Sequence, residues 1–262
     1  MKIFLLGGTK DSTNIIEHLK QNYDVFILTT TTTEYGARLA MEAGSDDTIA
    51  RPLLKDEIIE IIQRENFDIL IDATHPFAAH ITQTSSSIAR ELELPYIRFE
   101  RPITNLENID TSHIRYAESF DDAGKMIADE FRQGNVLHFA GANTMADIVK
   151  YISPERFYPR ILKVESSLKK CEELDIPSDH IIPMTGAATL KENIDLIEKY
   201  AASVMITKES GEIGGVVEKI EAANKTDIAV IMIKRPEIEM LNKDDIVNDL
   251  TELDSKIKSF KK

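Results

Sequence analysis

Short apolar runs alternate with amphipathic, helix-like stretches along most of this chain of 262 residues. In the first part the runs KIFLL, DVFIL, FDILI and YIRF are separated by stretches such as STNIIEHLKQN, in which apolar residues recur every three to four positions. Buried parallel strands are near-continuous apolar runs, and each needs a helical crossover to the next. The alternation therefore predicts an α/β fold with parallel sheets flanked by helices.

The alternation stops at about residue 104 and restarts near residue 134 with NVLHF, so the chain divides into two series. Each series ends in a strand-like run followed by arginine and proline, RFERP at 98–102 and IKRP at 233–236. We therefore expect two Rossmann-like domains, residues 1–104 and 105–262, with a ligand cleft between them.

The tail carries an apolar stripe at alternating steps of four and three, formed by Ile246, Leu250, Leu253, Ile257 and Phe260. This spacing predicts a terminal helix with one apolar face. The face either docks on the domain that the tail belongs to or forms a dimer seam, and the stripe is too short for a coiled coil.

Composition excludes several classes of protein. With 31 basic against 45 acidic residues the net charge is -14, whereas nucleic-acid binders need basic surfaces for their phosphate contacts. No apolar run approaches the roughly 20 residues that span a bilayer. Cys171 is the only cysteine, which excludes intrachain disulfides and thiolate metal clusters. We expect a cytoplasmic monomer or weak homodimer without nucleic-acid or membrane partners.

The first strand runs into a glycine-containing loop, Gly7-Gly8-Thr9, and a helix follows that contains Asp11 and Ser12. Glycines let the backbone approach a ligand, and the free N–H groups of a helix start attract phosphate. The spacing matches neither G-x-G-x-x-G nor a Walker A loop. The loop predicts a nucleotide site only in combination with its position after the first strand.

Five consecutive threonines, Thr29 to Thr33, end the second strand. In a dinucleotide-binding fold this position meets the adenosine ribose, where an acidic residue would select NAD. Hydroxyl groups accept a 2′-phosphate without repelling it, so NADPH fits at least as well as NADH.

The stretch DATHPFAAH follows the strand FDILI and places Thr74, His75 and Pro76 at a strand's carboxyl end, where open α/β sheets bind ligands. His75 and His80 are five residues apart and would not share a helix face, so we expect no metal site. Pro76 suits the first turn of the following helix. The stretch predicts a pocket rim with a hydrogen-bonding or stacking role for His75.

A second loop, TKESGEIGG at 207–215, follows the strand SVMI, and its glycines and Lys208 indicate an anion-binding loop. Other basic residues also stand at strand ends, namely Arg98, Arg101, Arg160 and Arg235. A bound polyanion would need bases in these positions. Neither the Tyr-x-x-x-Lys pair of short-chain dehydrogenases nor a G-x-S-x-G nucleophile motif occurs.

Together, GGTKDS, DATHPFA, RFERP, TKESGEIGG and IKRP resemble the precorrin-6A reductases of cobalamin biosynthesis and their cobalt-precorrin counterparts, from residue 1 to about 236. The resemblance implies hydride transfer from NADPH or NADH to an anionic tetrapyrrole. It implies cofactor contacts from Gly7, Gly8, Thr9, Asp11, Ser12, Thr29, Thr30, Thr31, Thr74, His75 and Pro76. It implies substrate contacts from Arg98, Arg101, Lys208, Ser210, Gly211 and Arg235.

The chain departs from the family pattern at two positions. Asp11 stands where the family has glutamate, and Gly186-Ala187-Ala188 replaces a Gly-Pro-Phe loop. Two other functions stay open at this point: a sensor that binds NADP without turnover, and a dinucleotide-fold reductase of another substrate. We assign no catalytic residue, because none stands out as an obligatory general acid.

Overall fold

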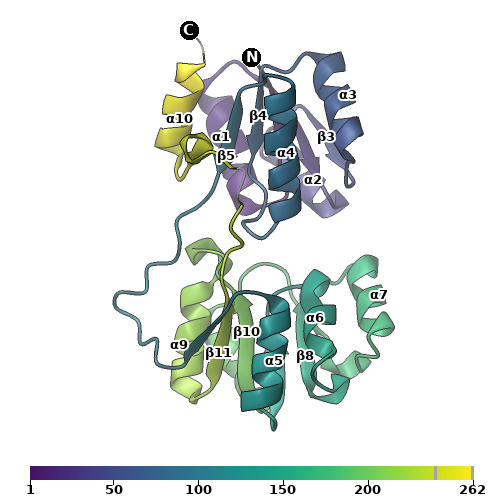
Figure 1. Cartoon of the computed structure of the whole chain (residues 1–262), viewed down its shortest axis with the longest axis vertical. Helices are drawn as coiled ribbons and strands as arrows, with labels where there is room; N and C mark the ends of the chain where they lie inside the picture. The colour runs from purple at the N-terminus through teal and green to yellow at the C-terminus, as the bar shows by residue number, and fades with distance from the viewer. Residues whose placement is uncertain (239–240, 261–262) are drawn as a thin grey trace. The chain divides into compact units, whose positions relative to one another are not determined.

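The computed structural model describes residues 1–238 and 241–260 and consists of two compact α/β units (Figure 1). The first unit contains Met1–Pro102 together with Pro236–Lys262, and the second contains Ile103–Arg235. Both predicted arginine–proline pairs therefore stand where the chain passes from one unit to the other.

The first unit has one parallel sheet with the strand order β12-β5-β4-β1-β2-β3. Because β12 is the sixth strand of this unit along the chain, the order corresponds to 3-2-1-4-5-6, that of dinucleotide-binding domains. The strands are β1 (Lys2–Leu6), β2 (Phe26–Thr31), β3 (Asp47–Ala50), β4 (Ile69–Asp72), β5 (Tyr96–Phe99) and β12 (Ile246–Val247).

Helices cover both faces of this sheet (Figure 1). One face packs on Ile15 of α1 and Leu253 of α10, and the other on Ile58 of α3 and Ile88 of α4. Side chains of a strand alternate between faces, so Leu5 belongs to the first core and Phe4 to the second. The helices are α1 (Lys10–Asn22), α2 (Glu34–Glu42), α3 (Lys55–Glu65), α4 (Ala79–Glu91) and α10 (Leu250–Ser259), with a 3-10 turn η5 (Lys243–Asp245).

The tail belongs to the first unit, so its expected place in a domain spanning 105–262 is wrong. Ile246 and Val247 form a strand beside Arg98 and Phe99 of β5 rather than part of the helix. Leu253 and Ile257 of α10 are fully buried in the core that also contains Ile3 and Leu5. The apolar stripe thus packs on the first unit. Burial of these side chains is the physical reason why the chain comes back from the second unit to the first.

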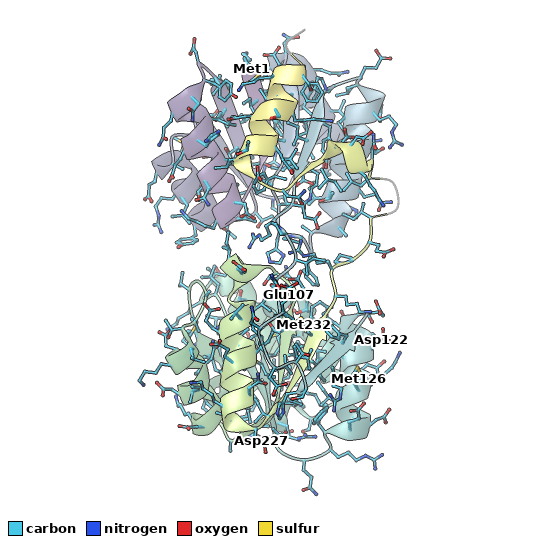
Figure 2. The ribbon with its side chains drawn as sticks, turned by 90° about the vertical axis from the view of Figure 1, so that its left-hand side faces the viewer. Met1, Glu107, Asp122, Met126, Asp227 and Met232 are labelled. Atoms are coloured by element: carbon cyan, nitrogen blue, oxygen red, sulfur yellow. The ribbon has the colours of Figure 1, made fainter. Side chains whose placement is uncertain are left out.

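The second unit also has a parallel sheet, with the order β6-β11-β10-β7-β8-β9. The strand order reverses between β7 and β10, and ligands bind at such switch points in open α/β sheets. In Figure 2, Met232 marks the carboxyl half of β11, and Asp227 lies just before its amino end. The strands are β6 (Ile114–Ala117), β7 (Asn135–His138), β8 (Phe157–Ile161), β9 (Ile182–Pro183), β10 (Ala202–Lys208) and β11 (Ala229–Ile233).

Ile197 of α8 and Ile220 of α9 pack on Leu137 and Val230 in one core of this sheet. The α-helices of the unit are α5 (Phe120–Glu130), α6 (Met145–Val149), α7 (Glu165–Glu173), α8 (Leu190–Lys199) and α9 (Val216–Thr226). Short 3-10 turns stand between them: η1 (Ala142–Thr144), η2 (Pro154–Arg156), η3 (Ser178–His180) and η4 (Glu212–Gly214).

The segment 104–134, in which the sequence shows no strong strand, contains β6 and α5. β6 is an edge strand whose central Arg115 and Tyr116 are exposed, so it lacks the continuous apolar run of a buried strand. Within the described residues, no helix is both long and apolar enough to cross a membrane.

Candidate functional site

The loop after β1 is shaped for a close approach to the backbone. A Cβ atom on Gly7 would lie 2.9 Å from Thr29 Cγ2 and 3.1 Å from Ser12 Oγ, so only glycine fits there. Gly8 has a φ of +92°, which L side chains rarely adopt, and the space beside it is open except for Thr31 Cβ at 3.9 Å. The loop therefore leaves room for a ligand beside Gly8.

Thr9 and Ser12 hold the start of α1 in place. Thr9 Oγ1 accepts a hydrogen bond from Ser12 N at 3.1 Å, and Ser12 Oγ accepts one from Thr9 N at 3.1 Å. Thr9 Oγ1 also donates to the Ala73 carbonyl at 2.7 Å, and Ser12 Oγ donates to the Thr9 carbonyl at 2.7 Å. The Thr9 hydroxyl thus joins the loop after β1 to the loop after β4, and the Ser12 hydroxyl fixes the first turn of α1.

Asp11 and Arg101 form a nearly buried ion pair within the first unit. The pair joins the first turn of α1 to the segment after β5, and the guanidinium neutralises an acid that would otherwise repel a phosphate at this helix start. Arg101, which the sequence assigns to the substrate, therefore has a partner in the cofactor half of the predicted site.

The three predicted threonines of β2 differ in their surroundings. Thr29 is fully buried, and its hydroxyl lies 2.7 Å from Ser45 Oγ, so it stabilises the unit from inside. Thr31 Oγ1 donates to the Thr33 carbonyl at 2.9 Å, and Thr33 caps α2 by accepting from Gly36 N. Thr30 is buried as well. Thr32, which is not among the site residues predicted from the sequence, is exposed just after this strand.

A buried polar network fixes the loop after β4. Arg98 and Asp72 are both fully buried and pair at 2.9 Å on neighbouring strands. Arg98 Nη1 also donates to the Thr74 carbonyl and Oγ1, each at 3.1 Å, and Thr74 Oγ1 donates to Asp72 Oδ1 at 2.6 Å. Tyr96 donates to Asp72 Oδ2 at 3.2 Å, and burial raises the pKa of its phenol. Arg98 is thus positioned to hold Thr74.

His75 and Pro76 form a turn ahead of α4. The Ala78 N–H donates to the His75 carbonyl at 2.8 Å, and Pro76 occupies the second position of this turn, which suits its fixed φ. The expected start of the helix at Pro76 is therefore wrong, since α4 begins at Ala79. His75 Nδ1 accepts a hydrogen bond from Phe77 N at 3.2 Å, so the proton of the neutral ring is on Nε2.

The second loop, TKESGEIGG, is organised by Glu209. Glu209 Oε1 accepts from Thr104 N at 3.0 Å, from Thr104 Oγ1 at 2.9 Å and from Gly211 N at 3.2 Å. Its other oxygen pairs with Arg235, and both side chains are almost buried. The predicted substrate residues Gly211 and Arg235 thus both contact the Glu209 carboxylate, which is not among the residues predicted from the sequence.

Lys208 and Ser210 flank this carboxylate in the chain. Lys208 ends β10, with its ammonium 5.8 Å from the centre of the Phe120 ring, and burial lowers its pKa to about 8. Ser210 is nearly buried, and its hydroxyl lies 3.4 Å from the Lys208 carbonyl. The loop therefore brings a cation, a hydroxyl and a glycine together at the carboxyl end of a central strand.

Three further polar residues lie at the same sheet edge. His138 ends β7 and is fully buried, which lowers its pKa to about 3, and its Nε2 lies 3.0 Å from Thr144 Oγ1. Arg160 of β8 and Lys219 of α9 complete the group. The sequence identifies Arg160 as a base at a strand end. It does not identify His138, which lies in an apolar run, or Lys219, which lies beside Glu218 in an ordinary amphipathic helix.

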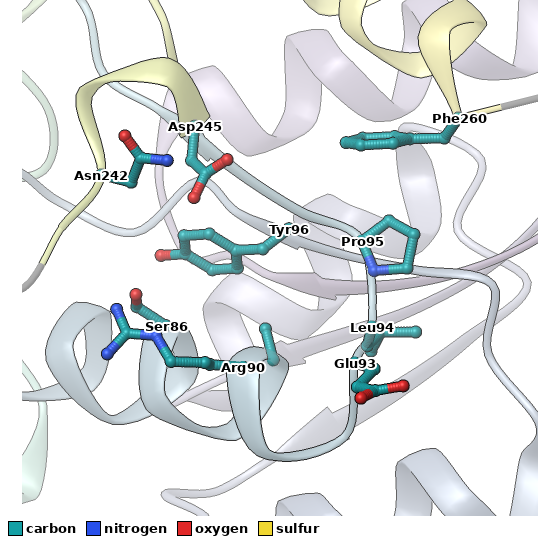
Figure 3. Close-up of a pocket in the computed structure, with 10 residues that line it drawn as sticks. Ser86, Arg90, Glu93, Leu94, Pro95, Tyr96, Asn242, Asp245 and Phe260 are labelled. Atoms are coloured by element: carbon teal, nitrogen blue, oxygen red, sulfur yellow. The ribbon is translucent and has the colours of Figure 1, made fainter.

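A surface pocket of about 410 Å³ in the first unit shares only Tyr96 with the site residues described above. Asn242 and Asp245 of the tail face Ser86 and Arg90 of α4 across Tyr96 (Figure 3). None of the residues that the sequence assigns to cofactor or substrate lines it. The pocket marks the seam between the tail and the rest of the unit.

The first unit fits a nicotinamide dinucleotide. Its strand order is the dinucleotide-binding one, a Cβ would fill the space beside Gly7, and the backbone at Gly8 is open. Hydroxyl side chains rather than an acid stand at the end of β2. These features are what the pyrophosphate and ribose of such a cofactor need.

Comparisons with known proteins agree with this geometry. The family model described as Precorrin-6x reductase CbiJ/CobK matches residues 2–258. Cobalt-precorrin-6A reductase of Methanothermobacter thermautotrophicus is 39% identical over 92% of this chain and 78% of its own length. The Methanocaldococcus jannaschii enzyme of the same name is 37% identical over 91% of this chain and 92% of its own.

The solved structure of CobK precorrin-6A reductase has a TM-score of 0.78 at 18% identity, covering 99% of this chain and 97% of that one, which shows a shared fold. The family model covers nearly the whole chain, and the first relatives align along most of both sequences. The chain belongs to the precorrin-6x reductase family.

Proposed function

We propose that this chain catalyses the reduction of cobalt-precorrin-6A in cobalamin biosynthesis, with NADPH as the preferred reductant. The observation that carries the proposal is the family match over residues 2–258. Membership of this family makes the chain an oxidoreductase that acts on a tetrapyrrole intermediate and uses a nicotinamide cofactor. The cobalt form is favoured because the two relatives described above are named for it.

The proposed cofactor residues lie at the carboxyl ends of β1, β2 and β4. The backbone of Gly7 and Gly8 would accommodate the pyrophosphate, with Asp11, Thr9 and Ser12 holding the loop. Thr31 and Thr32 would meet the ribose, and Thr74 and His75 would face the nicotinamide end, while Thr29, Thr30 and Pro76 would shape the site from behind. A bound nicotinamide supplies the hydride.

The proposed substrate residues are those of the second unit: Lys208, Ser210, Gly211 and Arg235. A tetrapyrrole with carboxylate side chains needs cations and N–H donors, which this loop supplies. We propose positioning roles for Arg98 and Arg101, because each is nearly or fully buried against an aspartate of the first unit.

The cofactor preference can be tested at Thr32. NADPH should bind more tightly than NADH in a titration that follows nicotinamide fluorescence. Thr32→Asp should reverse this order, because a carboxylate repels the 2′-phosphate and accepts hydrogen bonds from the 2′-hydroxyl of NADH. Thr251→Asp, at an exposed threonine of α10, is the control and should leave the preference unchanged.

The reaction itself is tested by following NADPH consumption with cobalt-precorrin-6A and with its metal-free form. Faster turnover of the cobalt form is the expected result. NADPH binding without consumption in the presence of either macrocycle would instead indicate a sensor, and binding of neither nicotinamide would contradict the proposed function.

A further inference from the structure

Three basic side chains gather at the carboxyl edge of the second unit's sheet. Lys219, in the first turn of α9, is only 3% exposed, and its ammonium donates to the Gly214 carbonyl at 2.8 Å. The Arg160 guanidinium lies 4.5 Å from the centre of the Phe139 ring, with Nη1 3.5 Å from Met184 Sδ. Lys208 ends β10, which β7 separates from Arg160's strand β8 in the sheet.

Lys219 lies close enough to Arg160 and to Lys208 for both charges to repel its ammonium. Burial, together with the nearby charges of Arg160 and Lys208, lowers the pKa of Lys219 to about 7. Lys208 also acts on His138, whose ring is held neutral by burial. The group therefore forms one electrostatic cluster around the switch point between β7 and β10.

Two glutamates lie near Arg160 and Lys219, but within the described residues neither forms a salt bridge with them. Glu192 accepts from Thr189 N at 2.8 Å and from Thr189 Oγ1 at 2.9 Å, which caps α8. Glu218 raises the pKa of Lys219 only as a nearby charge. In the part of the chain that the structure describes, Arg160 and Lys219 have no carboxylate within salt-bridge distance.

The loop 185–189 borders the start of α9. A Cβ atom on Gly215 would lie 3.1 Å from Ala187 Cβ and 3.8 Å from the Ala188 carbonyl, so the two segments touch. The loop consists only of threonine, glycine and alanine, and the Cβ side of Gly186 has open space. Because the side chains of this loop are small, a ligand group has room to pass the loop and reach the start of α9.

Buried cations without counter-ions destabilise a fold, because they lose hydration and repel one another. An anion that binds between them offsets both effects. An arginine fork accepts a carboxylate bidentately, and a lysine adds a compact charge. We propose that Arg160 and Lys219, with Lys208, form a subsite for one carboxylate side chain of the tetrapyrrole substrate. This inference rests on the proposed function.

The test uses charge removal in the full chain. Lys219→Met removes the ammonium and keeps an unbranched side chain, and Arg160→Gln keeps a polar group. Lys225→Gln removes an exposed charge from the same helix as Lys219 and is the control. The probe is uroporphyrin I, a polycarboxylate tetrapyrrole, followed by its fluorescence. The first two variants should bind it about tenfold more weakly, as expected for the loss of one charge-assisted hydrogen bond, and Lys225→Gln should match the wild type.

Two further readouts separate a ligand role from a structural one. Thermal unfolding of Lys219→Met should occur at or above the wild-type midpoint, because the variant loses an uncompensated buried charge. With cobalt-precorrin-6A, KM should rise in Arg160→Gln and Lys219→Met while kcat and NADPH affinity stay near wild type. A lower unfolding midpoint in Lys219→Met with unchanged probe binding would overturn the subsite.

The subsite and the reaction fail in different ways. If both variants keep the wild-type probe affinity and the wild-type KM, the subsite is refuted and the reductase function is unaffected. Failure of the wild type to bind the probe would have the same two consequences. Loss of probe binding in the variants, with no turnover of the macrocycle by the wild type, would support the subsite and refute the proposed reaction.

Discussion

Individual polar residues at the strand ends serve two purposes, and the structure separates them. Arg98 and Arg101 hold aspartates of their own unit, and Thr29 bonds Ser45 in the interior. Thr32 is instead exposed just after β2, and Lys208 is partly exposed at the end of β10. Arginine and threonine give the same pattern in both situations, since the sequence shows the residue type and not its partner.

Substitution of Arg98 tests whether this arginine stabilises the first unit by pairing with Asp72. Arg98→Met leaves Asp72 buried without its cation, so the free energy of unfolding should fall by about 3–5 kcal/mol. Urea denaturation measures this change. Asp72→Asn in the same chain should recover part of the loss, and Lys55→Met, which breaks the exposed pair with Glu91, should cost no more than about 1 kcal/mol.

The lowered pKa of Lys219 leads us to expect that the free energy of unfolding rises with pH above neutrality. Its folded-state pKa is about 7, below the roughly 10.4 of an unfolded lysine, so between these values the unfolded chain binds more protons. The free energy of unfolding should therefore rise from pH 7 toward pH 10, with Lys208 adding in the same direction. The rise measured by urea denaturation should be smaller in Lys219→Met and unaltered in Lys225→Gln.

At the scale of elements, central strands were predictable and edge strands were not. FDILI and SVMI are buried on both faces of a sheet, and their apolar runs identify them. The edge strands β3, β6 and β12 are short and partly exposed, so their residues alternate or mix with polar ones. The tail's stripe correctly indicated the apolar face of α10, but not the strand before it.

The docking of α10 can be measured at Leu253. This side chain is fully buried among residues of β1 and α1, so Leu253→Ala should lower the free energy of unfolding by about 2–5 kcal/mol. Leu54→Ala is a matched control, because Leu54 is 74% exposed and its removal leaves no cavity. A loss of similar size in both variants would contradict the docking.

At the scale of the whole molecule, the second unit is an insertion in the first. The chain leaves the first unit after Pro102 and returns at Pro236, and both ends of the inserted unit bind the same carboxylate, since Glu209 accepts from Thr104 and pairs with Arg235. The first unit is complete only when the last residues of the chain have joined its sheet.

A chain that ends at Arg235 tests this dependence. It lacks β12 and α10, which leaves the core around Ile3 and Leu5 uncovered. NADPH binding should be lost, and binding of an apolar dye should rise. Restoration of NADPH binding by a separate peptide of residues 236–262 would show that the tail acts through packing. Normal NADPH binding by the shortened chain would contradict the prediction.

The sequence by itself determined the fold class, the two α/β units and the family, because apolar periodicity and motif spacing are local properties of the chain. The tertiary structure alone decided that the tail belongs to the first unit and that Arg98 is paired. It also brought Arg160, Lys208 and Lys219 together. These outcomes depend on contacts between residues far apart in the chain, and such contacts form only when the strands reach their order in the sheet.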